Sequence, residues 1–122
     1  MARTTFDGPI RIRRGAAVTQ QTDRSTGVTI NAPAGTITMN NASLAAGAEA
    51  KFTVTNSFVT STSVPVVALA SGQTADTSIV AVTAVANGSF QITVTNLNGV
   101  TADTGAGVIN FIVFNGSNAE RG

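Results

Sequence analysis

Apolar and polar residues alternate most regularly between residues 79 and 96, IVAVTAVANGSFQITVTN. Apolar side chains stand at every second position on both sides of the Asn-Gly pair at 87–88: Val80, Val82 and Ala84 before it, and Phe90, Ile92 and Val94 after it. A period of two is typical of a strand with one buried face, and Asn-Gly is a strong turn signal. The pattern therefore predicts a β-hairpin with one apolar face.

The loop of this hairpin determines which side chains share a face. A two-residue turn at 87–88 would pair Val85 with Phe90 and would divide the apolar side chains between the two faces. A three-residue loop at 86–88, with Gly88 in the left-handed conformation, keeps them on one face. We therefore expect the three-residue loop, with the pairs Ala84–Phe90, Val82–Ile92 and Val80–Val94.

Other segments have the length and composition of short strands, and none shows the period of an amphipathic helix; these strands are 28–30, 36–39, 50–56, 63–70 and 107–114. Short strands separated by turn residues predict an all-β fold, an antiparallel, jelly-roll-like β-sandwich of about six to eight strands. We expect an extended N-terminal arm at 1–26, the sandwich at 27–114 and a polar tail at 115–122. Alternation assigns to the core Ile37, Met39, Leu44, Phe52 and Val54. Pro65 cannot donate a ladder hydrogen bond and indicates an edge strand.

The segment 107–114, GVINFIVF, is almost continuously apolar. One face carries Ile109, Phe111 and Val113, and the other carries Val108, Asn110, Ile112 and Phe114. A domain of this size can cover one face with its own core, but a neighbouring subunit is needed to cover the other. We therefore expect a homo-oligomer, a dimer or a trimer, whose interface includes Val108, Ile112 and Phe114.

The first residues differ from the rest of the chain because they are basic. MARTTFDGPIRIRR contains four arginines and one aspartate, and Ile10 and Ile12 alternate with Arg11 and Arg13. Such a segment is either a disordered terminus or an arm that becomes ordered on a partner, adding a strand or filling a groove. The apolar residues favour the arm. The residues expected to anchor it are Arg3, Phe6, Ile10, Arg11, Ile12, Arg13 and Arg14.

The composition excludes most catalytic chemistry. The chain has no histidine and no cysteine, so a nucleophile activated by imidazole, a thiolate metal site and a disulfide are all excluded. Glu49, Asp76 and Asp103 stand singly, and we expect them to serve turns and solubility; their spacing does not favour a calcium site. We therefore expect neither an enzyme nor a cofactor or metal site.

Nucleic acid and membrane are also poor candidates as partners. Phosphate binding needs basic side chains on a folded face, and single-strand binding adds aromatic platforms. Here the basic cluster is confined to the arm, where Phe6 is the only aromatic residue, and the rest of the chain is nearly uncharged. No run of apolar residues has the length of a membrane span, and no apolar signal segment follows Met1. We expect a soluble protein that binds neither nucleic acid nor membrane.

Five motifs occur along the chain: the opening TTFDGPIR at 4–11, the AxLAAG loop at 42–47, VTNSxVT at 54–60, the VANGSFQITVTN hairpin at 85–96 and the closing INFIV at 109–113. Together they resemble a small all-β module of virion structural proteins of tailed bacteriophages. The resemblance covers most of the chain, roughly residues 3–114. Related modules occur in capsid decoration proteins, head fibres and tail fibres, so the resemblance identifies a module more than a single function.

The resemblance implies a non-enzymatic virion protein, made in the host cytoplasm and located on the capsid surface. The first hypothesis is a capsid decoration or cement protein, in which the sandwich forms a homo-oligomer, with a trimer favoured, and the arm docks on the major capsid protein. The alternative is a receptor- or glycan-binding tip of a tail or head fibre. Sugar platforms usually use Trp or Tyr, and the chain has neither.

Overall fold

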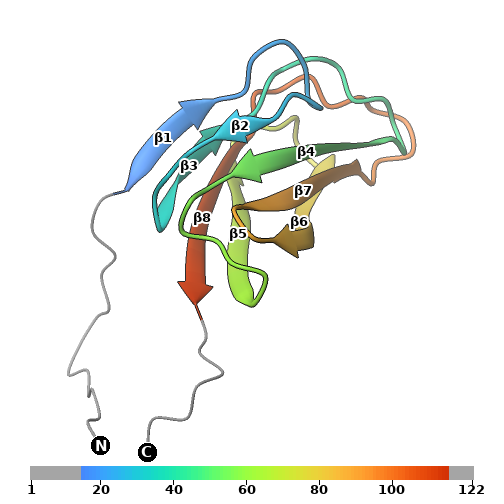
Figure 1. The fold of residues 1–122 in the computed structure, drawn as a ribbon. Coiled ribbons are helices and arrows are strands. Elements are labelled where there is room, and N and C mark those ends of the chain that lie inside the picture. Colours follow the sequence, from blue (N-terminus) through green and yellow to red (C-terminus); the bar gives the residue numbers. More distant parts are fainter. Residues whose placement is uncertain (1–14, 116–122) are drawn as a thin grey trace, which may run out of the picture.

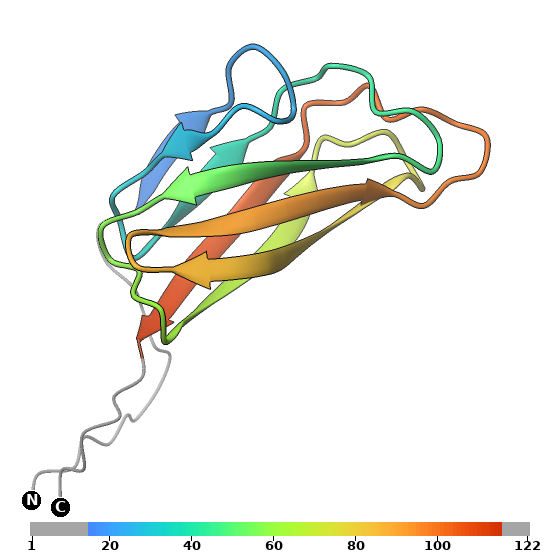
Figure 2. The same ribbon diagram turned by 45° about the vertical axis from the view of Figure 1, so that its right-hand side comes forward.

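The computed structural model describes residues 15–115 of the 122-residue chain. Eight strands form two four-stranded sheets, which lie face to face in Figures 1 and 2. The first sheet contains, in order, β1 (Ala16–Thr19), β3 (Ala34–Thr38), β8 (Val108–Asn115) and β5 (Ser63–Ser71). The second sheet contains, in order, β2 (Val28–Thr29), β4 (Glu49–Thr55), β7 (Ser89–Asn96) and β6 (Ser78–Ala86).

The predicted β-sandwich is confirmed, with eight strands and no helix within residues 15–115. β5 lies at an edge of the first sheet, as Pro65 indicated. Four strand pairings are antiparallel, but β1 pairs with β3, and β2 with β4, in parallel. These parallel pairs arise because β1 to β4 alternate between the sheets, so that each strand reaches its neighbour by a crossover rather than by a hairpin.

One apolar core fills the space between the sheets. The predicted core residues Ile37, Met39, Leu44, Phe52 and Val54 are all buried, and so are the inward residues of β7 and β8, while Val80 and Val82 of β6 are partly buried against them. The rings of Phe90 and Phe111 connect the two sheets at a centroid distance of 6.0 Å. Burying one large apolar side chain contributes about 1.5–3 kcal/mol, so alternation was enough to determine which faces of β3, β4, β7 and β8 turn inward.

The hairpin of β6 and β7 forms as predicted, but its loop differs. Val85 pairs with Phe90, and only Asn87 and Gly88 lie between the strands, so the predicted three-residue loop at 86–88 and the pair Ala84–Phe90 are wrong. The register then shifts by one residue at Thr83, and beyond it the predicted pairs Val82–Ile92 and Val80–Val94 are present. The β-bulge keeps the apolar residues on one face and turns Val85 toward the core as well.

Gly88 has a φ of 85°, in the region that side chains with a Cβ atom avoid. A Cβ atom at this position would meet no other atom within 4 Å, so a substitution is costly through the backbone alone. We expect Gly88→Val to lower the free energy of unfolding by about 1 kcal/mol or more, and the melting temperature by roughly 4–8 °C. Gly99→Val is the matched control, because Gly99 is equally open but has no positive φ. Equal melting temperatures for the two variants would contradict the argument.

The sandwich begins earlier in the chain than predicted. β1 lies within 1–26, the segment expected to be an arm, and it pairs with β3 over its whole length. Gln20 and Arg24, in the loop that follows, are buried. The AAVT sequence of β1 contains a single large apolar side chain, Val18, so no alternation marked it as a strand. The boundary at residue 26 is therefore wrong for residues 15–26.

Candidate functional site

The most distinctive surface of the protein is the outer face of the first sheet. Because side chains alternate along a strand, burying Ile109, Phe111 and Val113 turns the neighbouring residues of β8 outward. Phe114 is 52% exposed, and across the pairing with β5 lie Val64, 58% exposed, and Val66, 46% exposed. Val108, Ile112 and Phe114 thus lie on the face where the sequence analysis placed them. Their role as an oligomer interface stays a prediction.

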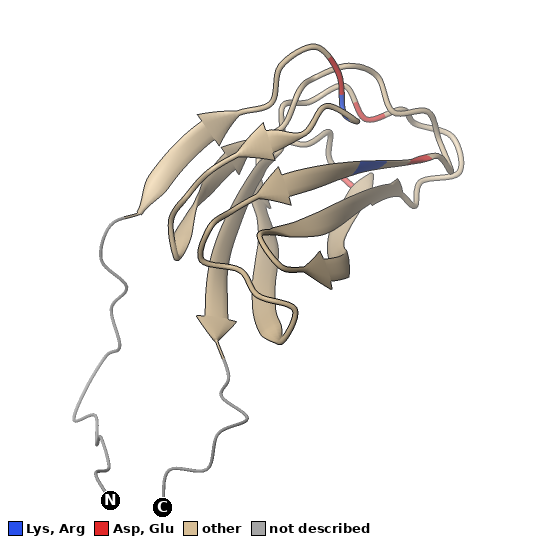
Figure 3. Cartoon of the chain, in the orientation of Figure 1, with Lys and Arg blue, Asp and Glu red and all other residues tan. Residues whose placement is uncertain are grey.

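The four strands of this sheet contain no charged residue. Figure 3 shows the charged residues gathered at one end of the sandwich, formed by loops 20–27, 40–48, 72–77 and 97–107, which we call the loop end. The opposite end, where β1 begins and β8 ends, we call the terminal end (Figure 1). The outer face of the first sheet therefore offers no charge to recognise a charged partner.

A shallow hollow of about 300 Å³ lies on this face, between β5 and β8. Its lining includes two cross-strand pairs, Val66–Ile112 and Ala68–Asn110, and the single methyl group of Ala68 leaves space beside Val66. The hydroxyl of Thr36 on β3 donates a hydrogen bond to the side-chain oxygen of Asn110, 3.3 Å away. The side-chain oxygen of Asn110, the polar group of this face, therefore already has a hydrogen-bond donor within the sheet.

The outer face of the second sheet is different in character. It carries Glu49 and Lys51 on β4, whose side chains lie 3.5 Å apart, and a row of threonines. The hydroxyl of Thr83 is hydrogen-bonded to Gln91 at 3.0 Å and to Thr93 at 2.8 Å. This polar face suits contact with water. The contrast singles out the first sheet as the surface that lacks a partner.

The loop end is held together by a buried ion pair that the sequence analysis missed. Arg24 is 4% exposed and Asp103 is fully buried, with Nη1 of Arg24 3.6 Å from Oδ2 of Asp103. The guanidinium also donates to the carbonyl oxygens of Ala42, Asp103 and Gly105. The carboxylate accepts from the amides of Thr74, at 2.9 Å, and Gly105, at 3.0 Å, and from the hydroxyl of Ser78, at 2.6 Å. Two side chains thus connect all four loops.

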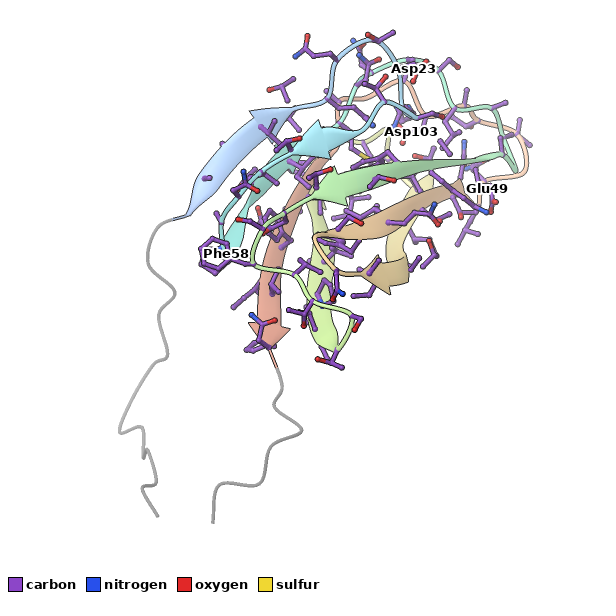
Figure 4. All side chains as sticks on the ribbon, viewed as in Figure 1. Asp23, Glu49, Phe58 and Asp103 are labelled. Carbon is purple, nitrogen blue, oxygen red and sulfur yellow. The ribbon has the colours of Figure 1, made fainter. Side chains whose placement is uncertain are left out.

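Asp103 was expected to serve only a turn or solubility, and Arg24 was counted with the arm. The structure corrects both predictions. No local pattern could have paired them, because 79 residues separate them along the chain. Figure 4 shows Asp103 within the loop end and Asp23 and Glu49 nearby, while Phe58 lies well away from them.

The environment of Asp103 shifts its acidity. Burial raises the pKa of this carboxyl, but the hydrogen bonds from Ser78, Thr74 and Gly105 and the charge of Arg24 outweigh that effect and lower the pKa below its usual value. A folded-state pKa below the unfolded-state value, about 3.9, means that the carboxylate stabilises the fold above that pH. The contribution is lost as the pH falls through the folded-state pKa.

We therefore expect the free energy of unfolding to decrease as the pH is lowered below about 4. Urea unfolding at a series of pH values from neutral to strongly acidic would measure this decrease. Asp103→Asn should show a weaker decrease, because the group that titrates has been removed. If the two proteins had the same acid dependence, other carboxyls would have to be responsible.

Little in the described residues suggests catalysis or metal binding. No group of three potential metal ligands among Asp and Glu lies together within residues 15–115. Asp103 uses both carboxylate oxygens for protein donors, and Asp76 is exposed in a loop at a φ of 58°. The same part of the chain contains no helix long and apolar enough to cross a membrane.

The predicted arm cannot be placed. All seven residues expected to anchor it lie outside the described residues: Arg3, Phe6, Ile10, Arg11, Ile12, Arg13 and Arg14. The chain enters the described part at Gly15, directly before β1 in the first sheet. Sequence reasoning predicted a strand at 63–70 but did not assign Val64 and Val66 to the candidate surface.

Comparison of the chain with protein-family models, with curated protein sequences and with solved structures found no match. The site is therefore interpreted from its own geometry and chemistry.

Proposed function

We propose that this protein is a non-enzymatic structural component of a virion, a capsid decoration or cement protein. The observation that supports the proposal is the uncharged, apolar outer face of β5 and β8, whereas the outer face of the second sheet carries Glu49, Lys51 and several threonines. An exposed apolar face without charges fits a permanent protein contact better than a transient ligand site. Binding through Val108, Ile112 and Phe114 gives the protein a homo-oligomeric state.

The basic residues before β1 supply the second contact. Residues 1–14 carry four arginines and one aspartate, whereas residues 15–115 carry two basic and four acidic residues. β1 begins at the terminal end (Figure 1), so a contact between the residues before it and the major capsid protein would leave the loop end pointing away from the shell. Arginine–carboxylate contacts and added backbone hydrogen bonds would hold it there.

A receptor- or glycan-binding tip of a fibre is the second candidate. It is favoured by two exposed aliphatic side chains at the loop end, Leu97 and Val100, of which Val100 is 90% exposed. The lack of Trp and Tyr in the chain weighs against sugar binding, because stacking on these rings usually supplies much of the affinity. We therefore place the decoration protein first.

The copy number and position of this protein on purified particles distinguish the two candidates. Quantitative gels against the major capsid protein, followed by imaging of the particle, would supply both. A decoration protein should be present in hundreds of copies distributed over the shell. A few copies confined to the tail or to one vertex would overturn the proposal and favour the fibre tip.

A further inference from the structure

We propose that the outer face of β5 and β8 docks on the same face of a second copy about a two-fold axis, so that the protein is a face-to-face dimer. This inference rests on the proposed function only in assuming that the protein forms a homo-oligomer. It adds the number of copies and the way in which they pack. Three cross-strand pairs carry it, in order from the terminal end: Val64–Phe114, Val66–Ile112 and Ala68–Asn110.

The three pairs form rows of different height on the face. The first row is tall, because Val64 and Phe114 both project from the sheet and are more than half exposed. The third row is lowest at Ala68, whose side chain is a single methyl group, and the hollow of about 300 Å³ is lined by this row and the middle row. The middle row, Val66 and Ile112, lies between them. Successive rows are two residues apart along each strand, or about 7 Å.

A two-fold axis that runs across the strands through the middle row makes these rows complementary. It reverses the direction along the strands, so the tall row of each copy lies over the low row of the other. Phe114 of one copy then enters the hollow beside Ala68 and Asn110 of its partner, while the middle rows meet each other. Two sheets packed face to face stand about 10 Å apart, which interdigitating side chains of this kind can fill.

The charge distribution favours a second copy over other partners. A charged partner would find no opposite charge on this sheet, whereas two copies of it meet without repulsion between like charges. Burial of Asn110 is eased because its side-chain oxygen already accepts the hydrogen bond from Thr36.

A two-fold axis also needs only one surface, because the same patch serves both copies. The trimer that the sequence analysis favoured would need a second, different patch that fits this face. Among the other large exposed apolar side chains of the described residues, Ile79, Leu97 and Val100 lie on the second sheet or at the loop end, and Phe58 is a single ring in the loop between β4 and β5. The geometry therefore favours the dimer.

Ala68→Glu in the full-length protein tests the interface, because it places a charge in the hollow under the partner's Val64 and beside its Phe114. Ala81→Glu is the matched control: Ala81 is also an exposed alanine within a nine-residue edge strand, but on the second sheet. Light scattering after size exclusion should give twice the chain mass for the native protein and for Ala81→Glu. Ala68→Glu should weaken the dimer by about 100-fold or more, because a charge would be buried there without a partner.

A cysteine variant tests the same interface even if the Ala68→Glu variant fails to fold. The natural chain contains no cysteine, so Val66→Cys introduces a single thiol in the row through which the axis passes. A short bismaleimide should join two Val66→Cys chains and should leave Ala81→Cys, on the opposite face, unlinked.

Three results would overturn the dimer: a monomer at every concentration tested, a trimer, or a dimer that Ala68→Glu leaves intact. None of them decides whether the protein decorates a capsid, since the number of copies on particles answers that question separately. A dimer that fails to bind particles would instead count against the proposed function and leave this inference standing.

Discussion

Asp103→Asn should lower the free energy of unfolding by about 3–5 kcal/mol, the largest loss of stability we expect from a single polar substitution in this protein. The substitution removes the charge opposite the buried guanidinium of Arg24, and it replaces an acceptor of three hydrogen bonds by a group with one acceptor oxygen. Small domains are stable by about 5–15 kcal/mol in total. Urea unfolding at neutral pH would measure the loss.

Glu49→Gln is the matched control for this substitution. It makes the same change from carboxylate to amide in an ion pair with Lys51, but both side chains are about half exposed. Exposed pairs contribute about 0–1 kcal/mol, so this variant should unfold at nearly the same urea concentration as the native protein. A loss of the same size in both variants would show that burial of Asp103 is not the cause.

A double variant tests whether the loss of stability comes from the missing ion pair or from leaving one charged group buried without its partner. Arg24→Met together with Asp103→Leu removes both charges and keeps apolar volume in the loop end. Because replacing a complete buried pair is often much less costly than removing one partner, we expect the double variant to be more stable than Asp103→Asn. If it were the less stable of the two, the loops would depend chiefly on the hydrogen bonds that these side chains make to backbone groups.

The sequence predicted the faces of the strands better than their connections. Alternation in 107–114 predicted correctly that Phe111 points inward and Phe114 outward, because burial of one face is the dominant energy and has a period of two. It could not predict that β5, rather than another strand, would lie beside β8. The sequence therefore predicted the β8 half of the candidate surface, which is Val108, Ile112 and Phe114. It did not predict the β5 half, which is Val64 and Val66.

The errors have physical causes of the same kind. The hairpin loop was predicted wrongly because the three-residue loop and a two-residue turn with a bulge at Thr83 both turn Val80 and Val82 inward, and no residue type distinguishes the two arrangements. Arg24 was assigned to the arm because a buried ion pair across 79 residues leaves no periodic signal. Likewise β1, which is short and lies at an edge, gains its stability from pairing with β3 and needs few apolar residues of its own.

Removing residues 2–14 should abolish attachment to the capsid while leaving the sandwich and its dimer unchanged. The eight strands and the core that the structure describes are formed by residues 15–115, and the proposed dimer face lies on β5 and β8. The melting temperature and the mass in solution should therefore equal those of the full-length protein. Binding to particles stripped of this protein, followed by sedimentation, would measure attachment.

Two full-length variants then separate the contributions within the arm. Replacing Arg11, Arg13 and Arg14 by glutamine removes charge-assisted hydrogen bonds of about 1.5–3 kcal/mol each, which should weaken binding by at least about 1000-fold and make it less sensitive to salt. Replacing Ile10 and Ile12 by serine should weaken binding without changing its salt dependence, because these side chains contribute apolar contact only. If the shortened protein still attached as tightly as the native one, the capsid contact would have to lie on the sandwich, and the loop end would be the next surface to test.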